Sequence, residues 1–123
     1  MAWKLIKNTA GSNRTTGEFF TDAAKIPAAA NFIHIQIDLG VTPIPGTSGV
    51  IYSQISTNNG ATWEDFTPYY FEYTGLPGKF GDVTIPSIVY GIPSEFKNSD
   101  IRLRVDVNQD VFIGFNLYWD NAA

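Results

Sequence analysis

The chain has 123 residues, a length that suits one domain with a single hydrophobic core. Hydrophobic residues make up 44% and charged residues 16%, a balance opposite to that of disordered segments. A net charge of −4 with scattered basic residues argues against a nucleic-acid partner, and the absence of cysteine excludes disulfides and thiolate chemistry. Aromatic residues reach 15%, so some must lie at the surface, where they favour contact with a partner.

The N-terminal stretch MAWKLIKNTAGSN lacks the apolar run expected of a signal peptide. Only Leu5 and Ile6 separate Lys4 from Lys7, whereas a signal peptide carries an apolar run of about seven residues or more. No apolar run approaches the ~20 residues of a membrane helix. We therefore expect a protein made and used in a bacterial cytoplasm, or released with a particle assembled there, and no membrane partner.

Strand periodicity dominates the first half of the chain. A strand is expected over 2–7, followed by the turn cluster NTAGSNRTTG. The segment FTDAAKIPAAANF predicts either one helical turn, capped by Thr21 or Asp22 and stopped by Pro27, or a plain loop. In FIHIQIDLG apolar and polar residues alternate, as in a strand with one buried face. The apolar row consists of Ile33, Ile35, Ile37 and Leu39.

The second half continues with short strands between Gly- and Pro-containing turns. Strands are expected over 49–56, 63–66, 69–74 and 83–90. In DIRLRVDVNQDVFIGFNLYWD, two apolar rows flank a short loop over 108–110, which predicts a C-terminal hairpin. The rows consist of Ile101, Leu103, Val105 and Val107, then Val111, Ile113, Phe115, Leu117 and Trp119.

The last expected strand also carries aromatic residues on its second face. Phe112 and Tyr118 lie opposite the apolar row, with Gly114 and Asn116 between them. This second face would be covered by another layer of the chain or by a neighbouring subunit. Together the elements predict an all-β fold: a compact antiparallel β-sandwich of about eight strands, jelly-roll-like, in one domain over 1–123.

The stretch STNNGATWEDF predicts a hairpin turn. Asn59 and Gly60 tolerate positive φ, Ser56 and Asn58 can bond N–H groups of the turn, and Trp63 can fold over it. The eight residues from Ser56 to Trp63 resemble the Asp-box, a turn motif of sialidase-like propellers and of other β-proteins, with Asn58 in place of the usual Asp. In those families the motif is a structural turn away from catalysis. The resemblance therefore implies a hairpin and not a sialidase.

Glu64, Asp65 and His34 are the candidates for a small hydrolase. Neighbouring residues of a strand point to opposite faces, so Glu64 and Asp65 do not flank one bond, although Glu72 or Asp82 could partner either of them. No nucleophile motif accompanies His34, which is expected at a surface or an interface. We therefore expect no enzymatic activity.

Oxygen-bearing residues near the last loop allow two interpretations. Asp106, Asn108 and Asp110 could hold calcium, although the EF-hand spacing is missing. Alternatively, Asp106 forms a surface ion pair with Arg102 or Arg104. One histidine without cysteine offers transition metals few ligands, so no cofactor is expected.

The segment TPYYFEYTGLPGKF is the richest in aromatic residues. Tyr69, Phe71 and Tyr73 fall on one face of a strand and suit core packing, whereas Tyr70 faces the other way. Tyrosines on a β-scaffold serve sugar-binding surfaces and protein interfaces alike, so structural, protein-binding and sugar-binding roles all stay open here.

Small, acidic, cysteine-free β-sandwiches of this kind resemble the decoration (cement) proteins of tailed-bacteriophage heads. The resemblance is one of size, fold class and general sequence character over the whole chain. The resemblance implies a trimeric or dimeric protein of the virion surface that clamps major capsid subunits and stabilises the shell. Residues 1–16 would form an arm that touches neighbours. The expected partner contacts are Trp3, Tyr69, Tyr70, Tyr73, Phe80, Phe112 and Tyr118.

The alternative function is a carbohydrate-binding module of a tail or receptor-binding apparatus, with a glycan as the partner. Aromatic rings stack on sugar rings, and a carboxylate accepts hydrogen bonds from sugar hydroxyl groups, so a sugar-binding surface would combine both. Its residues would be Trp63, Tyr70, Tyr73 and Glu64.

Overall fold

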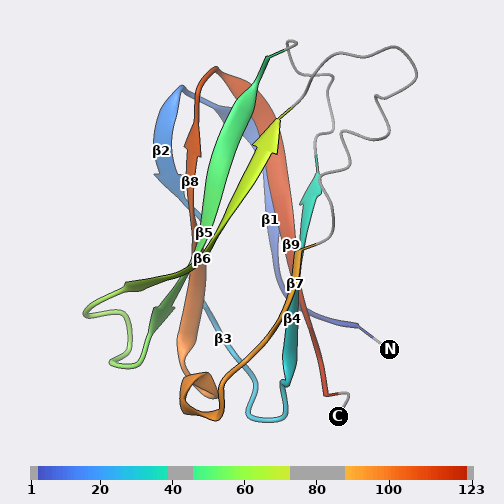
Figure 1. Ribbon diagram of the computed structural model, residues 1–123, viewed down its shortest axis with the longest axis vertical. Coiled ribbons are helices and arrows are strands. Elements are labelled where there is room, and N and C mark those ends of the chain that lie inside the picture. Colours follow the sequence, from blue (N-terminus) through green and yellow to red (C-terminus); the bar gives the residue numbers. More distant parts are fainter. Residues whose placement is uncertain (1–2, 39–45, 73–87, 122–123) are drawn as a thin grey trace.

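The computed structural model describes residues 3–38, 46–72 and 88–121, which form a sandwich of two sheets (Figure 1). The N-terminal part contributes the strands β1 (Lys4–Arg14), β2 (Gly17–Phe20), β3 (Ala24–Lys25) and β4 (Phe32–Asp38). The remainder contributes β5 (Ser48–Ser56), β6 (Glu64–Glu72), β7 (Ile88–Gly91), β8 (Asp100–Val107) and β9 (Val111–Asp120). A 3-10 helix, η1 (Ser94–Phe96), lies between β7 and β8.

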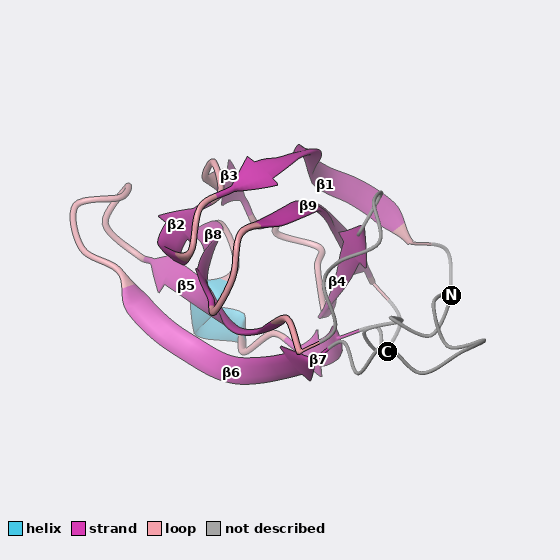
Figure 2. Ribbon diagram, turned by 90° about the horizontal axis from the view of Figure 1, so that it is seen from above, coloured by secondary structure: helices cyan, strands magenta, loops and turns pink. Residues whose placement is uncertain are grey.

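The described strands pair antiparallel throughout. The first sheet has the order β1-β9-β4-β7, and the second has the order β2-β8-β5-β6, with β3 pairing beside β2 on β8. With the two-residue β3 set aside, each sheet holds four strands, and their order is that of a jelly roll. Figure 2 shows the two sheets curving around a common interior. The predicted antiparallel, jelly-roll-like β-sandwich is confirmed.

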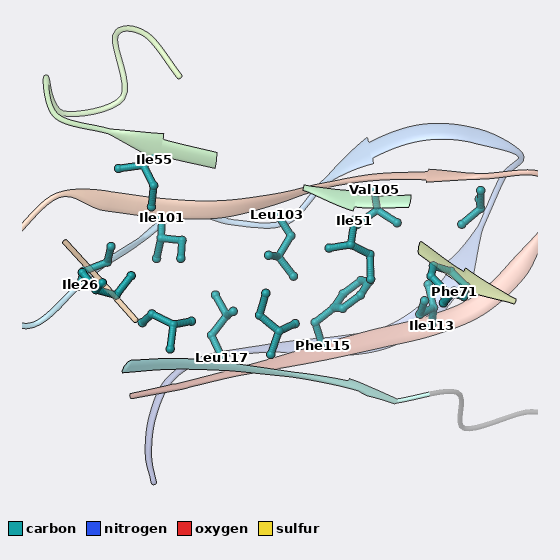
Figure 3. Packing of buried hydrophobic residues seen from close by; sticks show 14 of the residues in the cluster. Ile26, Ile51, Ile55, Phe71, Ile101, Leu103, Val105, Ile113, Phe115 and Leu117 are labelled. Atoms are coloured by element: carbon teal, nitrogen blue, oxygen red, sulfur yellow. The ribbon is translucent and has the colours of Figure 1, made fainter. Parts of the chain in front are cut away.

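The core lies between the two sheets and is built from the apolar rows that the sequence predicts. Figure 3 shows the β8 row pointing at the β9 row across the interior. The residues of these two rows that are at most 5% exposed are Ile101, Leu103, Val105, Val107, Val111, Ile113, Phe115 and Leu117. Burying each such side chain contributes about 1.5–3 kcal/mol, so these rows are a main source of stability.

The predicted C-terminal hairpin over 101–119 is wrong in its pairing. β8 pairs with β2, β3 and β5 in the second sheet, whereas β9 pairs with β1 and β4 in the first. Both strands present an apolar row to the same core, so alternation alone does not separate a hairpin from a corner between sheets. Asn108 holds this corner, because its Oδ1 accepts from Ser48 N at 2.7 Å and its Nδ2 donates to Gly46 O at 3.0 Å.

The N-terminal segment forms an edge strand, not the arm expected of residues 1–16. β1 pairs with β9 from Lys4 opposite Trp119 to Arg14 opposite Val111, so the expected turn cluster after residue 7 lies largely within a strand. The register shifts twice, between Leu5 and Lys7 and between Thr9 and Ser12. Such bulges bend an edge strand and discourage further pairing.

The folded chain decides two other local predictions. Of the two alternatives expected for FTDAAKIPAAANF, the described residues show the loop and no helical turn, with the two-residue β3 within it. The backbone N of the fully buried Ile26 donates to Ser99 O at 2.8 Å and holds this loop on the second sheet. The strands expected over 63–66 and 69–74 merge into β6, where Pro68 is tolerated at a sheet edge. Of the strand expected over 83–90, only β7 lies within the described residues.

Candidate functional site

The hairpin between β5 and β6 has the internal hydrogen bonds that the sequence predicts for this turn. Ser56 Oγ accepts from Gly60 N at 2.8 Å, and Asn58 Oδ1 accepts from Thr62 N at 3.0 Å. Asn59 and Gly60 have φ values of 60° and 86°, as the predicted turn requires. These bonds satisfy the turn internally, so the motif is a structural turn that positions the residues after it.

Beyond the turn, Asp65 joins a charged cluster on the outer surface of the second sheet. Arg104 donates to Asp65 Oδ2 at 2.8 Å through Nη2 and to Glu18 Oε2 at 3.0 Å through Nη1. The bonds from Arg104, and from Gln54 at 2.9 Å, hold the pKa of Asp65 below its ordinary value, and Asp65 in turn raises the pKa of Arg104. Arg104 therefore pairs with Glu18 and Asp65, and not with Asp106 as one interpretation of the sequence expected.

Arg102 lies one outward position along the same strand, between two aromatic rings. Its Cζ is 4.3 Å from the ring centroid of Phe20 and 4.3 Å from that of Trp63. Its Nε donates to Gln54 Oε1 at 2.8 Å. Arg104 is similarly stacked, 4.1 Å from the ring centroid of Tyr52. Cation–π contacts of this kind hold the guanidinium groups in place.

We call this outer surface of the second sheet the arginine–aromatic face. It also carries the most exposed aromatic side chains of the described chain: Tyr70 is 62% exposed and Phe20 is 42% exposed. Tyr70 lies opposite Val50 on the outward register, and its hydroxyl donates to Glu72 Oε2 at 3.0 Å. The residues of the face are Glu18, Phe20, Tyr52, Gln54, Trp63, Asp65, Tyr70, Arg102 and Arg104.

The outer surface of the first sheet carries a hydrogen-bonded set of uncharged polar side chains. Asn8 donates to Asn116, Asn116 Nδ2 donates to Gln36 Oε1 at 3.3 Å, and Tyr118 Oη donates to the same oxygen at 3.2 Å. The four side chains therefore link β1, β9 and β4. We call this set the amide ladder.

His34 lies beside the amide ladder and contacts the aromatic rings of Trp3 and of the ladder member Tyr118. Its ring centroid is 5.2 Å from that of Trp3 and 5.5 Å from that of Tyr118. Both ring nitrogens are buried without a hydrogen-bond partner, and this burial lowers the pKa of His34 below its ordinary value. The environment thus favours the neutral imidazole.

We expect His34 to make stability depend on pH in mildly acidic solution. The pKa of His34 is lower in the folded chain than in the unfolded chain, so the unfolded chain takes up the proton first as the pH falls. The free energy of unfolding is therefore highest above about pH 6.5 and declines below that pH. Urea unfolding at pH 7.5 and 5.5 should show this decline, with a slope below the one-proton limit of about 1.4 kcal/mol per pH unit. The aromatic, non-titrating variant His34→Phe should not show this decline. If the free energy of unfolding falls equally with pH in both proteins, the decline does not come from His34.

The second face of β9 is contacted by the β1 bulge near Phe112 and Gly114. A Cβ placed on Gly11 would lie 2.5 Å from Phe112 Cε1, and one placed on Gly114 would lie 2.7 Å from Gly11 N. The β1 bulge therefore crosses Gly114, with the Phe112 ring against it, and Tyr118 belongs to the amide ladder. Because β1 belongs to the same sheet as β9, these contacts do not decide between the two explanations that the sequence left open, another layer of the chain or a neighbouring subunit.

The expected partner residues are dispersed in the structure. Trp3 and Tyr118 flank His34, Phe112 packs on the β1 bulge, and Tyr69 is half-buried against the core. Tyr70 is the one that stays well exposed within the described residues. Tyr73 and Phe80 lie outside those residues.

The residues considered for catalysis or for metal binding do not lie together in one site. Asp65 lies on the outer surface of the second sheet, and His34 lies on that of the first. Asp110 Oδ1 accepts from Thr16 N at 2.7 Å and from Thr16 Oγ1 at 2.9 Å, which lowers the pKa of Asp110. Within residues 3–38, 46–72 and 88–121, no three His, Cys, Asp or Glu side chains gather as metal ligands would.

The arginine–aromatic face is not evident from the sequence. Its members come from β2, β5, β6, β8 and the turn before β6, and only strand order makes them neighbours. One signal was available: Tyr52 and Gln54 share an outward register, as do Arg102 and Arg104.

No protein-family model, curated protein or solved structure shows a significant match to this chain. In the part of the chain that the structure describes, no helix is long and apolar enough to cross a membrane. Functional assignment therefore depends on the geometry of the two outer faces.

Proposed function

We propose that this chain is a structural assembly protein of the capsid decoration (cement) class, and that it docks through the arginine–aromatic face. Its partners would be major capsid subunits of a phage head, together with copies of itself as a dimer or trimer on the capsid surface. A protein that binds only the assembled shell stabilises that shell by mass action. The role requires binding and no catalysis.

The observation that carries the proposal is the exposure of Tyr70 and Phe20, at 62% and 42%, beside two stacked arginines on one sheet. Protein interfaces are enriched in aromatic residues and arginine, and a few of these residues supply most of the binding energy. The bonds among Arg104, Glu18 and Asp65 restrict side-chain motion before docking. Less conformational entropy is then lost on binding.

The test is an add-back experiment on heads from which the protein has been removed. Wild-type protein should raise the temperature at which these heads disrupt, and Tyr70→Ser should need about tenfold or more protein for the same effect, because truncating an interface aromatic costs about 1–2 kcal/mol or more. Leu5→Ser is the matched control, since Leu5 is also an exposed hydrophobic residue, at 54%, but lies on the first sheet.

Two results would contradict the proposal. One is a disruption temperature that wild-type protein leaves unchanged. The other is equal activity of the Tyr70→Ser and Leu5→Ser variants and the wild type, because the arginine–aromatic face would then make no contact.

The amide ladder favours a second candidate function, carbohydrate binding. Side-chain amides offer both donors and acceptors to sugar hydroxyls. Aromatic rings are present there too, in the ladder member Tyr118 and in Trp3, both of which contact His34. Of the sugar-binding surface expected from sequence, Trp63 is instead stacked on Arg102. A glycan array separates the two functions: specific binding that Gln36→Ala abolishes and Tyr70→Ser leaves unchanged would favour the carbohydrate-binding module.

A further inference from the structure

The guanidinium group of Arg102 contacts two aromatic rings and is hydrogen-bonded along one edge. Cζ lies over the rings of Phe20 and Trp63, 4.3 Å from each ring centroid. The Nε edge donates to Gln54 Oε1 at 2.8 Å, and Gln54 is itself fixed by donating to Asp65 Oδ1 at 2.9 Å. Gln54 is only 7% exposed, so this support is rigid.

The remaining edge of Arg102 has unused donors. Its Nη1 and Nη2 form no hydrogen bond with any described residue, and the described ion pairs do not include Arg102. Arg104 differs, because its two terminal nitrogens are bonded to Glu18 and Asp65. One of two adjacent arginines is thus neutralised, whereas the other keeps its charge and a free pair of donors.

We infer that Arg102 is a preformed binding site for a carboxylate, and that this carboxylate is an Asp or Glu side chain of the docked protein partner. The inference rests on the proposed function and adds the chemistry by which the face recognises its partner. Two parallel N–H groups match the two oxygens of a carboxylate, and such charge-assisted pairs are about twice as strong as neutral ones. The aromatic rings keep the donor pair oriented, so little side-chain entropy is lost when the carboxylate arrives.

The surrounding charges favour a carboxylate over a phosphate. Asp65 and Glu18 lie on the same face, and the chain carries a net charge of −4. A phosphate brings up to two negative charges and is usually met by several cations, whereas one arginine suffices for a single carboxylate. Charge complementarity therefore selects a monovalent, planar anion.

The test uses NMR with sodium acetate as the probe and sodium chloride at equal ionic strength as the reference. Acetate should shift the Arg102 Nε–H resonance and the indole N–H of Trp63, with little effect on Arg104, which serves as an internal control. In Arg102→Lys, which keeps the charge but loses the paired donors, the acetate affinity reported by Trp63 should fall about tenfold. Lys25→Gln, which removes one positive charge elsewhere on the second sheet, should leave that affinity unchanged.

Three outcomes would overturn the inference: equal shifts at Arg102 and Arg104, equal shifts with acetate and chloride, or a stronger response to inorganic phosphate than to acetate. The Trp63 indole spectrum without acetate shows whether each variant is folded. Because no capsid is involved, acetate binding with a failed add-back experiment would reject the docking proposal alone. A successful add-back without acetate binding would reject the carboxylate site alone.

Discussion

Replacing Phe115 by alanine should lower the free energy of unfolding by about 3–5 kcal/mol, the loss expected when a large aromatic side chain is removed from a core. Phe115 is 1% exposed and projects from β9 into the space between the sheets (Figure 3). Its ring centroid is 6.3 Å from that of Phe19 on the opposing sheet, so truncation leaves a cavity with partners on both sides. Urea unfolding monitored by tryptophan fluorescence measures the change.

This loss is large because the total free energy of unfolding of a native domain is only roughly 5–15 kcal/mol. Tyr70→Ala is the matched control: it also truncates an aromatic residue of a strand, but at an exposed position, where changes usually stay within about 0.5 kcal/mol. A loss for Phe115→Ala that is no larger than the control would mean that the two sheets do not pack as described.

Gly114→Ala should also destabilise the protein strongly, although it adds only one methyl group. The new Cβ would lie 2.7 Å from Gly11 N, 2.8 Å from Thr9 O and 2.9 Å from Gly11 Cα. All three atoms belong to the β1 backbone, so no side chain can rotate away and the strand itself must move. We expect a loss of about 1–3 kcal/mol or more, as for overpacked interiors.

Amide hydrogen exchange shows which part of the chain Gly114→Ala destabilises. Amides of β1 around the bulge should lose protection in Gly114→Ala, because β1 is displaced from β9. Gly91→Ala is the control within a strand, since its Cβ would meet its nearest atoms at an ordinary 3.9 Å. Unchanged protection along β1 in Gly114→Ala would show that the bulge does not cross Gly114.

The candidate site was less predictable than the fold. The sequence indicated that Tyr70 points away from the core, and the register agrees. It placed Phe112 and Tyr118 on an apolar second face, but β1 and the amide ladder use these residues internally. Their aromatic character alone did not reveal this, because a ring packs equally well on a partner or on a bulge of the same chain.

Local sequence is enough to predict which residues face the core and where the β5–β6 hairpin turns. Alternation of apolar and polar residues indicates which face of a strand is buried. Ser56, Asn58 and Gly60 define a local turn whose hydrogen bonds span four residues. Only the tertiary structure decided which strands pair. It placed β8 and β9 in different sheets, brought β1 over Gly114 and gathered Phe20, Trp63 and Arg102 into one site. The physical reason is that alternation depends on neighbours in the chain, whereas strand pairing and the side chains that it brings together depend on contacts between distant segments.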